Sequence, residues 1–67
     1  MKKKYSEFYS HLKKYLYLVA YNTFLMNDSE AEGFVQRETR RRYSIGCTLI
    51  KSGRYTEADL IAMYPLT

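Results

Sequence analysis

The chain has 67 residues, a formal net charge of +4 and 46% hydrophobic residues. This length predicts one small domain over residues 1–67, and the hydrophobic fraction excludes a disordered polar tail. The single cysteine, Cys47, excludes an internal disulfide, and one histidine with one cysteine cannot complete a structural zinc site. Because a domain this small buries only about 60% of its unfolded surface, we expect oligomerisation or partner binding to add stability.

The N-terminal segment does not fit a targeting signal. Lys2–Lys4 precede an apolar stretch, as in a secretory signal, but Glu7, His11 and Lys13 interrupt it and no clean cleavage site follows. The apolar run is also shorter than the roughly 20 residues that a membrane-spanning helix needs. We therefore expect a soluble protein without a transmembrane segment, and its lone cysteine suits a reducing cytoplasm.

The first predicted helix runs from about residue 4 to residue 26. With about 100° between successive residues, one apolar stripe follows its whole length: Tyr5, Phe8, Tyr9, Leu12, Tyr15, Leu16, Val19 and Met26. The opposite face is polar in the first half, where Ser6, Glu7 and Lys14 lie, as a solvated surface should be. We expect the stripe to lie in the core.

The second half of this helix is apolar on both sides. Its second apolar face consists of Tyr17, Leu18, Tyr21, Phe24 and Leu25. A chain of this length has few other elements with which to cover that face, and tyrosine is enriched at protein interfaces. We therefore predict that the face binds a partner. The alternative is that a third helix covers it with Leu60, Ile61 and Tyr64.

Capping patterns place two further helices. Ser29 and Glu32 have the spacing of a capping box, which predicts a second helix from about residue 30 to residue 52, followed by Gly53 in a left-handed conformation. Thr56 and Asp59 repeat the pattern and predict a short third helix over residues 57–63.

Three helices predict an all-α fold, in which the first two form a long antiparallel hairpin and the short third helix crosses one end. The alternative is a bundle of two hairpins that dimerise through the second apolar face. Residues 44–50 include β-branched side chains, but an isolated strand would have no pairing partner, so we predict helix there. Gly46 then lies on the apolar side, either where another helix approaches closely or as an unremarkable small residue.

The second helix carries a basic face. Its polar residues within about 100° of arc are Arg37, Arg40, Arg41, Ser44, Thr48 and Lys51. Guanidinium and hydroxyl groups donate hydrogen bonds to phosphate oxygens, so this face is a candidate site for nucleic acid or an acidic partner. A solvated basic helix is the plain alternative. Lys2–Lys4 would add a basic arm.

Arg42 differs from the other arginines because it projects into an apolar arc of the second helix. That arc consists of Phe34, Val35, Thr39, Ile45, Leu49 and Ile50. Glu38 lies one turn earlier, in the order that favours an ion pair within a helix. Either the pair is partly buried and sets the register of the helices, or the Arg42 stem crosses the core edge and its guanidinium reaches water. We favour the second interpretation.

The sequence contains no recognisable catalytic constellation. His11 lies one turn from Glu7, which is usually a surface pair, and Cys47 lies at the edge of the apolar arc, where a small buried thiol is expected. The sequence also lacks a glycine-rich phosphate loop and metal-ligand spacing. We therefore predict that the protein is not an enzyme and uses neither a cofactor nor a metal.

The leading hypothesis is a non-catalytic helical interaction protein, an inhibitor or adaptor of the kind that phages and other mobile elements encode. It would dock the second apolar face, the basic face or both onto a larger protein or nucleoprotein. The alternative is a dimeric regulator that contacts nucleic-acid phosphates through Arg37, Arg40 and Arg41. A peripheral membrane protein is a third hypothesis, opposed by the expected burial of the apolar stripe.

Overall fold

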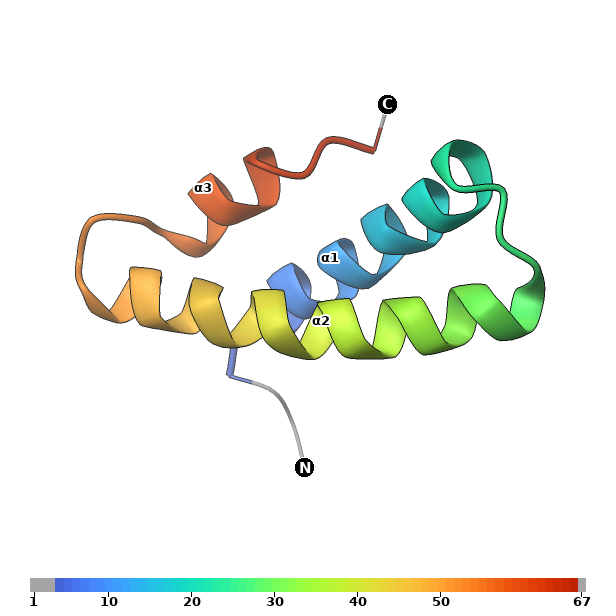
Figure 1. Cartoon of the computed structure of the whole chain (residues 1–67). Coiled ribbons are helices and arrows are strands. Elements are labelled where there is room, and N and C mark those ends of the chain that lie inside the picture. Colours follow the sequence, from blue (N-terminus) through green and yellow to red (C-terminus); the bar gives the residue numbers. More distant parts are fainter. Residues whose placement is uncertain (1–3, 67) are drawn as a thin grey trace.

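The computed structural model describes residues 4–66, which contain helices and no strand. α1 spans Ser6–Leu18, η1 continues it as a π-helix over Val19–Thr23, α2 spans Asp28–Lys51 and α3 spans Glu57–Ala62. α1 and η1 run antiparallel to α2, and α3 lies beside the first half of α1 (Figure 1). The predicted all-α hairpin with a short third helix is therefore confirmed. Lys2 and Lys3 of the predicted basic arm lie outside the described residues.

The core lies where α1 faces α2 and α3. Its buried residues are Phe8, Leu12 and Leu16 of α1, Ala20 of η1, Ala31, Val35, Thr39 and Gly46 of α2, and Leu60 of α3. Large side chains of α1 thus face small residues of α2, so the two helices can pack closely. Most of the predicted apolar stripe faces this core, since Phe8, Leu12 and Leu16 are buried and Tyr5 and Tyr15 pack against them. Tyr9 and Val19 are half-buried outside this cluster, and Met26 lies beyond the end of the helix.

Gly46 is a point of close approach between three helices. A Cβ atom at this position would lie 2.7 Å from Leu60 Cδ1 and nearer still to the Phe8 ring. The side chains of α1 and α3 therefore occupy the space that any other residue would need. This finding favours the first of the two interpretations of Gly46, and it fixes where α3 sits on the hairpin.

The start of α2 corrects one predicted cap. Asn27 Oδ1 accepts a hydrogen bond from the Glu30 N–H at 2.8 Å, and Glu30 Oε1 accepts one from the Asn27 N–H at 3.1 Å. The predicted Ser29 and Glu32 box is therefore wrong, and α2 starts at Asp28. Both pairs have suitable side chains at the same spacing, but Asn27 is the residue whose backbone is still extended where the loop ends.

The end of α2 and the start of α3 follow the predicted signals. Gly53 has a φ of 82°, the left-handed conformation expected after the last helical turn. Thr56 and Asp59 form the predicted capping box, with hydrogen bonds of 3.1 Å and 2.9 Å. Within residues 4–66, none of the helices combines the length and the apolar character that spanning a bilayer requires.

Candidate interaction surfaces

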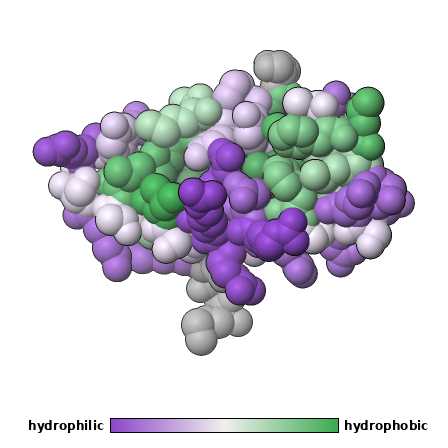
Figure 2. All heavy atoms as spheres, in the orientation of Figure 1, coloured by the Kyte–Doolittle hydropathy of each residue, from purple (hydrophilic) through white to green (hydrophobic). Residues whose placement is uncertain are grey.

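Large apolar side chains gather at the end of the hairpin. Leu18, Tyr21, Phe24 and Leu25, which we call the hairpin-end surface, are exposed by 41%, 39%, 55% and 80%, respectively. Figure 2 shows apolar surface at this end of the molecule, separated by a hydrophilic band from a second apolar area where α2 meets α3. Tyr17, the remaining residue of the predicted face, is half-buried and packs against the core.

The third helix leaves this surface open. Leu60 lies in the core beside Phe8, and Tyr64 packs edge-on against Tyr15 with ring centroids 5.2 Å apart. α3 therefore covers the first half of α1 rather than the hairpin end. The alternative in which Leu60, Ile61 and Tyr64 cover the second apolar face is wrong.

The backbone of the hairpin end differs from the continuous helix that the sequence predicts to residue 26. The Phe24 N–H donates to the Val19 carbonyl at 3.1 Å, and the Met26 N–H donates to the Ala20 carbonyl at 2.9 Å. Between them, Leu25 has a φ of 52°. A left-handed residue ends a helix in this way, although glycine usually occupies the position. Phe24 and Leu25 therefore project from the turn and not from a helical face.

Contacts hold the two aromatic rings of the hairpin-end surface in place. Tyr21 Oη donates to Asp28 Oδ1 at 2.9 Å, and the Tyr21 ring stacks on Tyr17 with centroids 6.2 Å apart. Phe24 meets Phe34 of α2 edge-to-face at 5.7 Å. The hydrogen bond to Asp28 raises the pKa of Tyr21, and desolvation and the charge of Asp28 raise this pKa further. Rings ordered in this way lose less entropy when a partner binds.

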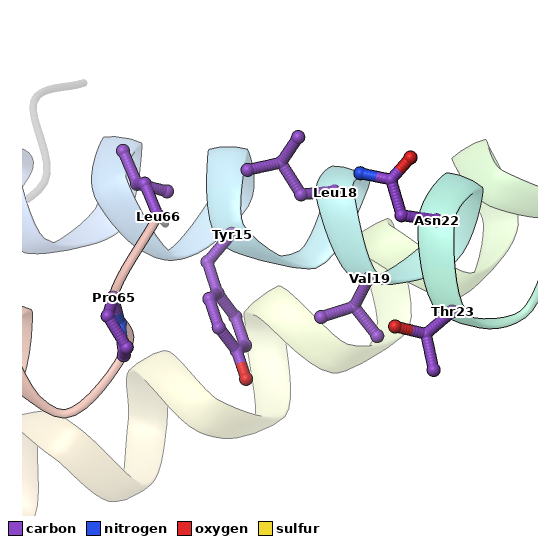
Figure 3. A pocket seen from close by; sticks show the side chains of 7 residues that line it. All are labelled: Tyr15, Leu18, Val19, Asn22, Thr23, Pro65 and Leu66. Carbon is purple, nitrogen blue, oxygen red and sulfur yellow. The ribbon is translucent and has the colours of Figure 1, made fainter.

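An open recess adjoins the hairpin-end surface (Figure 3). Its walls are Tyr15, Leu18, Val19, Asn22, Thr23, Pro65 and Leu66, and its volume is about 380 Å³. Pro65 and Leu66 come from the segment after α3, while the other residues come from α1 and η1. Leu18 belongs to both the recess and the hairpin-end surface, so an apolar group seated in the recess would be continuous with that surface.

Acidic residues border the hairpin-end surface. Asp28, Glu30 and Glu32 are all exposed in the first turns of α2. The hydrogen bond from Tyr21 shows that Asp28 lies directly beside the surface. Glu32 follows Asp28 by about one turn of α2, so the two carboxylates lie on the same face of the helix.

The predicted basic face is present along α2. Arg37, Arg40, Arg41, Ser44, Thr48 and Lys51 are all exposed. The helix is α-helical throughout, which keeps these residues in the predicted register. None of the three arginines forms an ion pair with a residue of the described range. The Thr48 hydroxyl instead donates to the Ser44 carbonyl at 3.2 Å, so its proton is already used.

Arg42 forms an ion pair with Glu38, which is the interpretation that we did not favour from the sequence. Its Nε donates to Glu38 Oε1 at 3.2 Å, and the two side chains are 39% and 24% exposed. The guanidinium also lies over the Tyr64 ring, 5.8 Å from its centroid. The pair is thus half-exposed, and Arg42 links α2 to the segment after α3 as well as to its own helix.

The remaining polar candidates have structural contacts. His11 Nε2 donates to the Tyr64 carbonyl at 2.5 Å, so the histidine turns to the C-terminal segment instead of pairing with Glu7. Cys47 is a free, half-buried thiol. No group of three His, Cys, Asp or Glu side chains in residues 4–66 is arranged to hold a metal ion.

Comparison with known proteins found no matching family model, curated protein or solved structure. Two residues that shape the hairpin-end surface were missed by sequence reasoning, namely Asp28 and Phe34. Their contacts with Tyr21 and Phe24 cross the turn, and helical spacing gives no signal for pairs of this kind.

Proposed function

We propose that the chain is a non-catalytic helical interaction protein, an inhibitor or adaptor that docks its hairpin-end surface onto a larger protein. The observation that carries this proposal is Leu25, which is 80% exposed and has a left-handed backbone. That conformation costs a non-glycine residue about 1–2 kcal/mol, and strained residues concentrate at binding sites. Glycine would end the helix without this cost, whereas leucine adds an apolar group that a partner can bury.

The charges around the surface favour a different protein over a second copy of the chain. In a two-fold dimer through the hairpin end, both copies would bring Asp28, Glu30 and Glu32 to one interface, where their like charges repel. We therefore infer a partner whose apolar patch is bordered by lysine or arginine. One apolar side chain of that partner would enter the recess beside Leu18. The single unpaired cysteine supports a cytoplasmic setting for this interaction.

Photo-crosslinking followed by measured affinities tests this function. A photoreactive amino acid in place of Phe24 captures the partner, whose Kd is then compared for the wild type, Phe24→Ala and Ile45→Ala. Ile45 is a matched control, because it is 52% exposed against 55% for Phe24 and lies away from the hairpin end. We expect the Kd to rise by about tenfold or more for Phe24→Ala and by less than about twofold for Ile45→Ala. Equal losses, or unfolding of Phe24→Ala by circular dichroism, would contradict the proposal.

Contact with nucleic-acid phosphates is a second candidate function. It is supported by the exposure of Arg37, Arg40 and Arg41 and by the lack of an ion pair for any of them within the described residues. Fluorescence anisotropy with a labelled random DNA duplex across a salt series tests it. Each phosphate contact contributes about −0.9 to the slope of log K against log salt, so Arg41→Gln should reduce the slope by about 1. Arg54→Gln is the control, because Arg54 is exposed beyond the end of α2; equal effects of both variants would argue against a defined face.

A further inference from the structure

A polar groove separates α1 from α2 on the part of the hairpin away from its apolar end. It is lined by Tyr9 and Lys13 of α1 and by Gln36, Thr39, Arg40 and Tyr43 of α2, and its volume is about 260 Å³. None of these residues belongs to the hairpin-end surface or to the recess beside it. The groove is therefore a feature separate from the docking surface at the hairpin end.

The groove combines two cations with no acidic lining residue. Lys13 and Arg40 are both exposed, and they come from different helices, so they stand on different walls. Neither forms an ion pair with a carboxylate in residues 4–66. The exposed amide of Gln36 adds two further N–H donors to the α2 wall. Hydrogen-bond donors from both sides of a groove favour an anion with several acceptor oxygens.

Thr39 gives an independent indication that a ligand belongs here. It is 2% exposed and is the one buried residue among those that line the groove, so it forms the floor. Its Oγ1 atom has no hydrogen-bond partner among the described residues. Buried hydroxyl groups are normally paired, and an acceptor oxygen bound in the groove would supply the missing partner once the hydroxyl turns toward it.

The aromatic wall of the groove is held in place. The rings of Tyr9 and Tyr43 meet edge-to-face at 90°, with centroids 5.2 Å apart. Tyr43 Oη accepts a hydrogen bond from the Tyr5 N–H at 3.2 Å, which ties this wall to the start of α1. The aromatic side of the groove is therefore built by packed side chains.

We propose that this groove binds a phosphate group. Lys13 and Arg40 donate to its oxygens from opposite sides, and Gln36 and the Thr39 hydroxyl complete the set of donors. The ligand is inorganic phosphate or a phosphate monoester whose remaining atoms lie against the tyrosine wall. The site does not depend on docking of the hairpin end, and of the basic face it uses Arg40 alone.

The test is a titration of the full chain with inorganic phosphate, followed by two-dimensional amide NMR at constant ionic strength with chloride as the reference. We expect phosphate to shift the Gln36 side-chain amide and the Thr39 and Arg40 backbone amides, with a Kd of about millimolar order for so small a ligand. The same titration with 5′-AMP distinguishes the two sources, because a monoester also shifts the Tyr9 and Tyr43 ring signals. Identical shifts with chloride would overturn the proposal.

Two matched pairs of variants locate the binding. Lys13→Gln and Arg40→Gln should each raise the phosphate Kd by about tenfold, as the loss of a charge-assisted hydrogen bond does. Lys14→Gln and Arg54→Gln remove the same charge from exposed positions outside both the groove and the basic face and should change the Kd by less than about twofold. Similar losses in all four variants would show general charge attraction and refute the site.

Thr39→Val tests the buried hydroxyl separately. Valine keeps the shape of threonine, so the variant should fold and should bind phosphate about threefold more weakly, as expected for one lost hydrogen bond. An unchanged Kd would overturn the role of Thr39. DNA binding by the basic face is distinguishable, because it should respond to Arg41→Gln and not to Lys13→Gln.

Discussion

Glu57, the first residue of α3, accepts a hydrogen bond at 2.9 Å through Oε2 from the backbone N–H of Phe8 in the first turn of α1. α1 has no side-chain cap of its own at Tyr5, and the first N–H groups of a helix lack partners within that helix. Glu57 therefore caps α1 from a distant part of the sequence. Its negative charge also suits the positive end of the α1 dipole.

Loss of this cap should destabilise the whole fold. We expect Glu57→Ala to lower the free energy of unfolding by about 1 kcal/mol, as removal of a helix cap does. Glu57→Gln keeps an acceptor oxygen without the charge, so it should lower the free energy of unfolding by less than Glu57→Ala does. The measurement is urea denaturation followed by circular dichroism, with the exposed Glu32→Ala as control. A Glu57→Ala variant as stable as Glu32→Ala would show that the cap contributes nothing.

The two helical glycines of α2 should respond to alanine in opposite directions. At Gly46, the new Cβ would clash with Leu60 Cδ1 at 2.7 Å and with the Phe8 ring, which should cost about 1–3 kcal/mol. At Gly33, the nearest atom is Arg37 Nη1 at 3.5 Å, an ordinary contact. Gly33→Ala should therefore gain about 0.5–1 kcal/mol from the higher helix propensity of alanine. Thermal unfolding of both variants measures this contrast, and two changes of the same sign would contradict it.

Helical periodicity predicts most of the core, because α1 and α2 are regular where they face each other. Leu12, Leu16 and Val35 are buried as the pattern indicates. Ile45 is different: the predicted apolar arc includes it, yet it is 52% exposed. The arc of α2 is wider than the area that α1 and the six-residue α3 cover. The width of an apolar arc shows which residues can be buried, but the length of the neighbouring helices decides which of them are buried.

The hairpin turn lies beyond what the sequence predicts. An excess of apolar residues correctly indicates that Leu18, Phe24 and Leu25 remain exposed. Their arrangement depends on the π-helical turns of η1 and on the left-handed φ of Leu25, where no glycine signals the end of the helix. Asn27 and Ser29 are both good capping residues, and the path of this turn decides that Asn27 is the residue that caps α2.

Arg42 should stabilise the fold through the packing of its side chain more than through its charge. The pair with Glu38 is half-exposed, so Glu38→Ala should cost only about 0.3–0.5 kcal/mol. Arg42→Ala also removes the stem and the contact with Tyr64, and should cost about 1 kcal/mol. Arg42→Met retains a long apolar side chain and should resemble Glu38→Ala. Chemical denaturation of the three variants measures the order of their stabilities. If Arg42→Met were as unstable as Arg42→Ala, the charge and not the stem would dominate.

The Tyr21 hydrogen bond should give alkaline pH dependence at the hairpin end. The pKa of Tyr21 is raised above 10.0, first by the hydrogen bond to Asp28. The contribution of this hydrogen bond to the stability of the fold is therefore complete below pH 10, and it is lost as the pH rises through the raised pKa of Tyr21. NMR titration of the Tyr21 ring should show Asp28→Asn lowering this pKa toward 10, while Glu30→Gln, which alters a carboxylate with no contact to Tyr21, leaves it unchanged. A pKa insensitive to Asp28→Asn would rule out the proposed cause.

Leu25 allows stability and binding to be separated at a single position. Leu25→Gly should raise the free energy of unfolding by about 1 kcal/mol, because glycine adopts the left-handed conformation without strain. Leu25→Ala removes the same apolar group but keeps a Cβ atom, so it should gain no stability. Glycine is normally less stable than alanine in and near helices, and the reversed order, measured by urea denaturation, would be specific to a left-handed site. Both variants should bind the partner more weakly than the wild type, since both lack the side chain that is 80% exposed. A Leu25→Gly protein that is more stable and binds as well as the wild type would remove Leu25 from the docking surface.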